Sequence, residues 1–354
     1  MEMMNSKEYK YKKTVRFWLL TGLIMLIGQV ILGGITRLTG SGLSITRWDI
    51  ITGVIPPLNA EQWVEAFNLY KDTPQFQKLN SNFNIADFKF IYFWEYFHRL
   101  WVRSLGFIFL IPFIFFVFKK QINFYLIKRL ALVIFLTILT ASAGWIMVQS
   151  GLVNRPWVNA YKLTIHFILA MLVIWAMVKT IADVYNYKND RSLKTKKIVS
   201  TVIGITFIQL IFAGLMAGMK AGLYYPTWPS MNGEIIPAVL LVQENWNWSN
   251  LINYDSYLFA PALVQFIHRG LAYILLILTI YMFFKLRNSL NNRSKIWLKS
   301  SVVLVIFQLI LGVLTVLYTK GKIPLFLGVS HQLLGLLYFI SLLFLFYSLR
   351  KSKA

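Results

Sequence analysis

The chain has 354 residues, of which 57% are hydrophobic and 16% aromatic, whereas only 14% are charged. This balance excludes a disordered chain and is unlike that of an ordinary soluble globule. The chain has a formal net charge of +23 and no cysteine, which excludes disulfides, iron–sulfur clusters, thiolate nucleophiles and cysteine-ligated zinc.

Eight apolar stretches are each long enough to cross a bilayer as a helix. In chain order they cover residues 15–36, 89–118, 128–150, 158–184, 198–219, 258–287, 299–319 and 323–349. No small-residue cleavage site follows the first stretch, so we expect a retained helix rather than a signal peptide. The sequence therefore predicts an all-α polytopic membrane protein with eight transmembrane helices.

The basic residues predict how these helices are oriented. Most of the 36 Lys and Arg residues lie in the two tails and in the connections near 119–129, 179–197 and 285–299. Since cytoplasmic segments carry the excess of Lys and Arg, we expect both termini on the cytoplasmic side of a bacterial inner membrane. The same distribution explains the high charge through membrane orientation and predicts no nucleic-acid partner.

The first outer loop, residues 37–88, contains a helical pattern. Asn59 is a candidate N-cap, and Gln62 occupies the capping-box position. Aromatic and apolar residues follow at helical spacing, namely Trp63, Ala66, Phe67 and Tyr70. We expect a short amphipathic helix on the outer membrane surface, either as a cover over the bundle or as a gate for substrate.

The two halves of the sequence repeat. A shift of 180 residues aligns Gln29 with Gln209 and, without a gap, continues through Gly34, Trp48 and Pro57, which meet Gly214, Trp228 and Pro237. A shift of 170 residues aligns His98-Arg99 with His268-Arg269. This pattern predicts two parallel four-helix repeats, one in residues 1–190 and one in residues 191–354.

The chain contains four histidines, and each lies in an even-numbered predicted helix: His98, His166, His268 and His331. Each is expected 8–10 residues from the outer end of its helix, which at 1.5 Å per residue is about 12–15 Å deep. A single intramembrane histidine is often a packing residue or a proton relay, but four at one depth favour a binding function. Paired imidazoles without a carboxylate at each pair are typical of bis-histidine haem, although zinc or copper would also bind histidine.

The repeat differs at one informative position. Glu95 precedes His98 by three residues, whereas Gln265 precedes His268 by three residues. Because residues three apart share a helix face, a carboxylate is expected beside the first histidine pair only. Glu95 is therefore a candidate for proton transfer or charge stabilisation, and the structural alternative is an ion pair with Arg99 or another arginine.

Several arginines lie near the outer interface: Arg37, Arg47, Arg99, Arg103, Arg155 and Arg269. Such side chains commonly extend to lipid headgroups. A guanidinium also matches a carboxylate, so some could bind haem propionates, and Arg99 and Arg269 are the better candidates because each follows a candidate ligand.

Taken together, these motifs resemble the heme A synthase family. The resemblance covers nearly the whole chain and rests on the segments 33–44, 95–99 and 266–269, on the His166 helix and on Ser330-His331-Gln332. It implies an oxidoreductase that converts the methyl group of haem O to a formyl group through an alcohol, giving haem A for terminal oxidases. It also implies a contact with the farnesyltransferase that makes haem O.

The resemblance also implies roles for individual residues. His98 and His166 would flank the substrate haem in the first repeat, and His268 and His331 would hold a cofactor haem b in the second. Glu95 matches the essential carboxylate of the family. Some members carry a cysteine pair in the outer loops, and this chain has none, so no mechanism through a loop thiol can operate here.

Two other functions account for part of this pattern. A non-enzymatic diheme cytochrome would use the four histidines but leaves Glu95 unexplained. A transporter would use the repeat and intramembrane histidines, but it predicts further acidic residues in mid-membrane, and the predicted spans contain almost none besides Glu95.

Overall fold

The computed structural model describes residues 11–47, 55–153, 155–185 and 193–349. Within these ranges, eight helices are long and apolar enough to cross a membrane, which confirms the all-α polytopic class. They are α1 (Lys13–Leu38), α4 (Ile85–Phe118), α5 (Phe124–Gln149), α6 (Ala160–Val184), α7 (Leu193–Gly218), α9 (Phe259–Leu286), α10 (Asn292–Leu317) and α11 (Leu325–Ser348). Their ends differ from the predicted spans by at most about two helical turns.

Asparagine side chains define the start of four of these helices. Asn84, Asn123, Asn159 and Asn291 are the N-cap residues of α4, α5, α6 and α10, and each accepts hydrogen bonds from backbone N–H groups of the first turn. These donors have no partner inside the helix, so the cap satisfies them where each apolar run begins.

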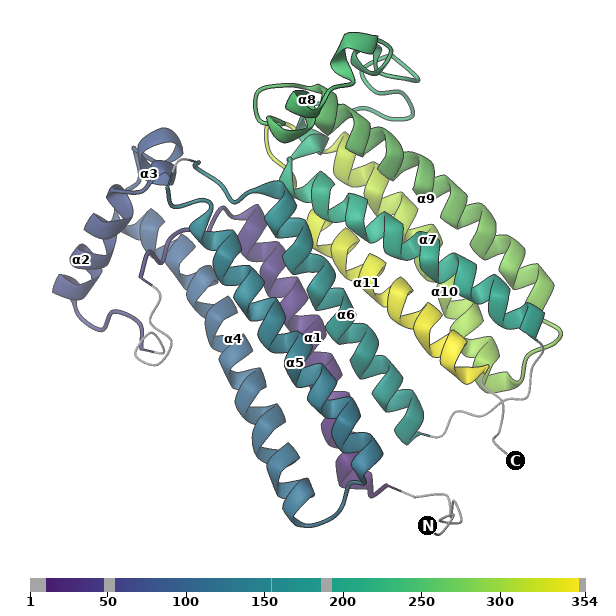
Figure 1. The fold of residues 1–354 in the computed structure, drawn as a ribbon. Helices are drawn as coiled ribbons and strands as arrows, with labels where there is room; N and C mark the ends of the chain where they lie inside the picture. The colour runs from purple at the N-terminus through teal and green to yellow at the C-terminus, as the bar shows by residue number, and fades with distance from the viewer. Residues whose placement is uncertain (1–10, 48–54, 154, 186–192, 350–354) are drawn as a thin grey trace.

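The spanning helices form two groups that lie side by side (Figure 1). In the first group, α1 packs against α4 and α6, and α5 packs against α6; in the second, α7 packs against α9, and α10 packs against α9 and α11. Helices α1, α6, α7 and α11 form the contact between the groups. The predicted boundary at residue 190 lies outside the described residues, as does the Trp48 match, and the parallel repeat stays a prediction.

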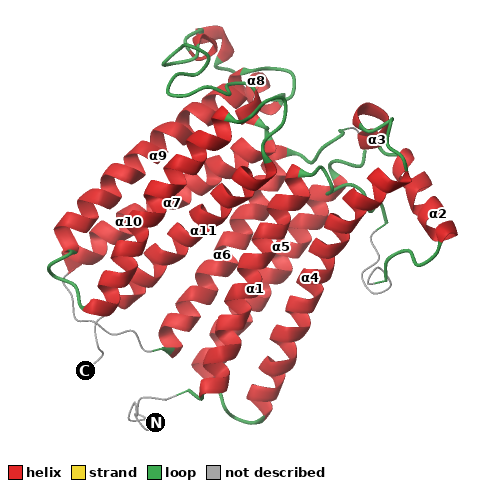
Figure 2. Cartoon of the chain, turned by 180° about the vertical axis from the view of Figure 1, so that it is seen from behind, coloured by secondary structure: helices red, strands yellow, loops and turns green. Residues whose placement is uncertain are grey.

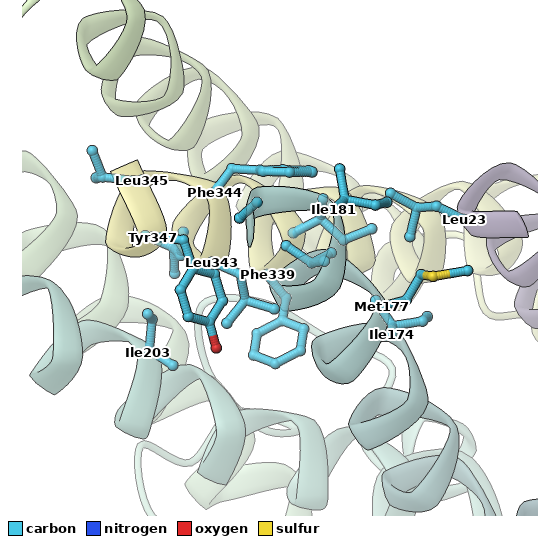
Figure 3. Close-up of a cluster of buried hydrophobic side chains, with 14 of the residues drawn as sticks. Leu23, Ile174, Met177, Ile181, Ile203, Phe339, Leu343, Phe344, Leu345 and Tyr347 are labelled. Carbon is cyan, nitrogen blue, oxygen red and sulfur yellow. The ribbon is translucent and has the colours of Figure 1, made fainter. Parts of the chain in front are cut away.

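The largest hydrophobic core lies where the two groups meet (Figure 3). Met177 of α6 and Phe339 and Leu343 of α11 are fully buried there. The indole N–H of Trp175 on α6 donates to the hydroxyl of Tyr347 on α11 at 2.6 Å. The core therefore joins the two groups rather than filling each group separately.

Two polar contacts also cross between the groups. The side-chain amide of Gln332 on α11 donates to the backbone carbonyl of Val30 on α1 at 2.6 Å. The guanidinium of Arg37, in the last turn of α1, donates to the carbonyl of Ala217 on α7. Hydrogen bonds to backbone carbonyls are favourable inside a membrane, where water does not compete for the same groups.

Short helices cluster at one end of the bundle, opposite the end where α1 begins and α11 finishes (Figure 2). They are α2 (Ala60–Lys71), α3 (Pro74–Leu79), α8 (Trp248–Ile252) and the 3₁₀ turns η2 (Ala221–Leu223), η3 (Ala238–Leu240) and η4 (Gln243–Asn245). They belong to the two long loops that the sequence places on the outer side.

Helix α2 confirms the predicted amphipathic helix and its cap. The side chain of Asn59 accepts a hydrogen bond from the backbone N–H of Gln62 at 2.9 Å, whereas the Gln62 side chain accepts from Leu58 rather than from Asn59. The apolar face of α2 packs on Phe88 and Ile91 of α4 instead of facing lipid. This packing favours the role of a cover.

Candidate functional site

Each histidine lies on its own spanning helix, as the sequence predicts. His98 is on α4, His166 on α6, His268 on α9 and His331 on α11. All four helices begin at the end of the bundle that carries the loop helices, so they run in the same direction. The histidines therefore occur in two pairs, one in each group of helices.

His268 and His331 face each other in the second group. Their ring centroids are 6.4 Å apart, and the ring planes are inclined by 67°. Because a metal–imidazole bond is about 2 Å long and the ring centre lies about 1 Å behind the nitrogen, two imidazoles on opposite sides of one metal place their centres roughly 6 Å apart. The spacing of this pair fits one iron between the rings.

His98 and His166 form the corresponding pair in the first group. The two residues are close enough for their charges to interact. The side-chain amide of Gln29 on α1 lies beside the His98 ring, with its nitrogen 3.3 Å from Nδ1 and 3.1 Å from Nε2.

Two of the imidazoles are oriented by backbone carbonyls of the preceding helix. His166 Nδ1 lies 2.9 Å from the carbonyl oxygen of Thr140 on α5, and His331 Nδ1 lies 3.1 Å from that of Gln308 on α10. Nδ1–H donation to a carbonyl selects the tautomer that leaves Nε2 as the ligand atom. Both rings are therefore arranged to present Nε2 to a metal.

Glycines on α5 and α10 make room for the same two rings. A Cβ added at Gly144 would lie 2.9 Å from His166 Cε1, and a Cβ added at Gly312 would lie 2.9 Å from His331 Cε1. A larger residue at either position would push the imidazole aside. The close approach of helix backbone and ring is thus the reason for glycine at these two positions.

The donor set suits haem better than a bare metal ion. Among the described residues, no group of three or more His, Asp or Glu side chains is placed to hold a metal. Haem supplies four nitrogen ligands itself and needs only axial ligands from the protein, which a pair of histidines provides. The residues present therefore fit bis-histidine haem, and zinc or copper would lack ligands.

Glu95 is buried, with only 3% of its surface exposed. One carboxylate oxygen accepts hydrogen bonds from the Ser44 hydroxyl and from the backbone N–H of Ile45, each at 2.8 Å. The other oxygen forms an ion pair with Arg99 at 2.5 Å. The predicted structural alternative, the pair with Arg99, is thus present, and the carboxylate also connects α4 to the first outer loop.

Gln265, at the matching position of α9, contacts its outer loop with the opposite polarity. It is fully buried, and its amide donates to the carbonyl oxygen of Tyr225 at 2.9 Å. The loop at Glu95 offers donors, whereas the loop at Gln265 offers an acceptor. The exchange of acid for amide is therefore matched by the local backbone.

Arg99 and Arg269 both bind carbonyl oxygens of the outer loops. Arg99 donates to Ile45 at 3.1 Å, and Arg269 donates to Tyr225 and Thr227 at 3.0 and 2.8 Å. Each arginine thus fastens a loop over its histidine pair. A role in binding haem propionates stays a prediction for both.

A second cationic cluster joins the outer loops of the two groups. Arg155 pairs with Asp255 at 2.9 Å, and the indole N–H of Trp157 donates to the same carboxylate at 3.0 Å. Lys220 lies over the Trp157 ring. Burial lowers the pKa of Lys220, and the positive charge of Arg37 lowers it further, while Asp255 opposes this shift.

Sequence reasoning did not assign a role to three residues that contact the site: Ser44, Gln29 and Gln209. The signal for Gln29 and Gln209 was present, since the two align under the shift of 180 residues. Ser44 had no such signal because its contact depends on how the loop folds onto α4.

Comparison with known proteins gives a consistent picture. A family model described as "Cytochrome oxidase assembly protein", COX15-CtaA, matches residues 16–343. The chain is 40% identical to the heme A synthase of a Wolbachia endosymbiont of Brugia malayi, over 98% of this chain and 100% of that protein. It is 36% identical to the heme A synthase of Flavobacterium psychrophilum over 91% of this chain and 94% of that protein, and 36% identical to that of Brucella anthropi over 94% and 91%.

Proposed function

Since the chain belongs to the COX15-CtaA family of cytochrome oxidase assembly proteins, we propose that it works as a heme A synthase, oxidising a methyl group of haem O to the formyl group of haem A. The reaction is an oxidation in two stages, through an alcohol. The observation that carries this proposal is the placement of four histidines as two pairs on four parallel helices.

The two pairs receive different roles. His98 and His166 bind haem O, and His268 and His331 bind a resident haem b. The asymmetry at Glu95 and Gln265 supports this division, because only the first pair has a carboxylate three residues from a ligand. When bound, haem b supplies one-electron redox chemistry to the protein.

Glu95 is the residue proposed to act in the oxidation. Each stage removes hydrogen from the reacting carbon, and a carboxylate nearby accepts the proton or stabilises developing positive charge. Ser44, Ile45 and Arg99 hold the carboxylate in a fixed orientation. A fixed carboxylate needs little reorganisation when charge develops beside it.

The proposed location is the bacterial plasma membrane, with both termini in the cytoplasm. The eight apolar helices and the bacterial relatives support a multi-pass membrane protein, and the distribution of Lys and Arg supports the orientation. Both haem sites would then lie towards the outer side. A farnesyltransferase that makes haem O would be a partner, because its product is the substrate of this enzyme.

One experiment tests the function directly. Haems extracted from cells with and without this protein are identified by mass, with the haem O-producing enzyme present in both. We expect haem A only where this protein is made, and haem O alone where it is absent. Equal haem compositions in the two extracts would contradict the proposal.

A further inference from the structure

The four imidazoles do not share the same kind of hydrogen-bond partner. His166 and His331 each have Nδ1 beside a backbone carbonyl of the preceding spanning helix, α5 or α10. For His98 and His268, the printed ring contacts are with glutamine side chains instead, Gln29 of α1 and Gln209 of α7.

The two glutamines are placed in the same way. The side-chain nitrogen of Gln29 donates to the backbone carbonyl of His98 at 3.4 Å, and that of Gln209 donates to the carbonyl of His268 at 3.0 Å. The same nitrogens lie beside the imidazoles, 3.1 Å from His98 Nε2 and 3.5 Å from His268 Nε2. Each amide is therefore held alongside a histidine at both its backbone and its ring.

Unpartnered polar atoms accumulate at these contacts. The side-chain oxygens of Gln29 and Gln209 are buried and accept no hydrogen bond, and Nδ1 of His268 is buried without a partner. Buried polar groups nearly always have a partner, and such exceptions often mark functional sites. An amide oxygen and an imidazole N–H are complementary, so the unpartnered atoms at Gln209 and His268 can satisfy each other.

We propose that Gln29 and Gln209 are positioning residues, whose amide oxygens accept the ring N–H of His98 and His268 and so direct the other ring nitrogen to the haem iron. A half-turn of each amide exchanges its oxygen and nitrogen without changing its shape. All four imidazoles then donate one N–H to an oxygen acceptor, from the backbone at α5 and α10 and from a side chain at α1 and α7.

This inference rests on the proposed function, because it assumes haem at both pairs. It adds a physical role, since a hydrogen bond to the second nitrogen of a ligating histidine fixes its orientation and makes it a more basic ligand. A more basic axial ligand stabilises the oxidised iron and lowers the reduction potential. Gln209 should therefore affect the potential of haem b as well as its retention.

The test uses the purified full-length protein with haem b bound. Gln209→Leu removes the acceptor at similar size, and Gln209→Glu replaces it with a stronger acceptor. Gln265→Leu is the matched control: Gln265 is a buried glutamine of the same half, and its printed bond goes to the Tyr225 carbonyl rather than to a histidine. The readouts are the reduction potential of haem b and the rate at which apomyoglobin captures it.

We expect Gln209→Leu to raise the reduction potential and to weaken haem b binding about 10-fold. We expect Gln209→Glu to lower the potential, and Gln265→Leu to leave it unchanged. Shifts in opposite directions for Leu and Glu would not follow from a loss of packing alone.

Two results would overturn the inference. One is a Gln209→Leu protein with the potential and haem retention of the wild type, and the other is a shift in the same direction for Leu and Glu. Failure of the proposed function looks different, because a wild-type protein that binds no haem b, or that keeps it after His268→Ala, refutes the site assignment before the glutamine variants are compared.

Discussion

The carboxylate of Glu95 accepts a hydrogen bond from the hydroxyl of Ser44 at 2.8 Å. The bond links a residue three positions before a candidate haem ligand to the loop that follows α1. The acid thus has both a structural partner and a position beside the proposed substrate. The two roles can be separated by substitution.

Replacement Glu95→Gln is expected to stop haem A formation while leaving the fold and haem binding intact. The amide keeps the size of the side chain but cannot accept a proton, and general acid–base groups contribute about 10²- to 10⁴-fold to rates. At matched protein level, the ratio of haem O and alcohol to haem A should rise at least 100-fold, on the order of that contribution. Near-normal haem A would leave Glu95 with the structural role alone.

Ser44→Ala is the control for that experiment. It removes one donor to the carboxylate but leaves the acid and its ion pair with Arg99 in place. Loss of such a buried hydrogen bond costs about 1 kcal/mol, so we expect lower thermal stability with haem A still produced.

Removal of a ligand in the second group should remove haem b. In His268→Ala, His331 remains as one axial ligand, and we expect haem b content to fall by more than about 10-fold, the scale of losses seen even for residues behind the ligands. His98→Ala should keep haem b at the wild-type level and lose haem A formation. Pyridine haemochrome spectra of the purified variants measure both. Full haem b in His268→Ala, with only haem O lost, would reverse the assignment of the two halves.

The glycines behind the rings offer a paired test. Gly312→Ala places a Cβ 2.9 Å from His331 Cε1, so the ring must shift, which costs about 1–3 kcal/mol. We expect haem b loss in Gly312→Ala, and haem A loss with haem b retained in Gly144→Ala.

Gly270→Ala on α9 is the control for these substitutions. Its added Cβ meets nothing within 4 Å, and alanine favours a helix by up to about 1 kcal/mol over glycine. Haem content of Gly270→Ala should match that of the wild type. An equal loss of haem in all three variants would mean that the effect is not specific to the rings.

The orientation can be measured with introduced cysteines, because the chain has none of its own. Asn68→Cys lies on the exposed side of α2, and Lys119→Cys lies in the connection between α4 and α5. In intact spheroplasts, a membrane-impermeant maleimide should label position 68 and reach position 119 only after permeabilisation. The reverse pattern would place the proposed haem sites towards the cytoplasm.

The spanning helices and their histidines could be predicted because the signals are local. Long apolar runs locate the spans, and the asparagines before α4, α5, α6 and α10 mark where helices begin. The cap at Asn59 likewise predicted α2. Its packing on Phe88 was not predicted, because a hydrophobic face does not specify whether lipid or protein covers it.

The contacts of the site are less visible in the sequence because they join distant segments. Ser44 meets Glu95 across 51 residues, and Gln29 meets His98 across 69. Periodicity and composition carry no information on such pairs. The repeat is the exception, since it aligned Gln29 with Gln209 before either contact was known.

The hydrogen bond from Gln332 to Val30 joins residues 302 positions apart, the first spanning helix to the last. When α1 enters the membrane during synthesis, its eventual partner has not yet been translated. The face of α1 that meets α11 must therefore wait beside lipid until the last helix is inserted. Biogenesis of this protein thus ends with the closure of its centre, and a chain truncated before α11 would leave that carbonyl and the whole α1 seam without their partner.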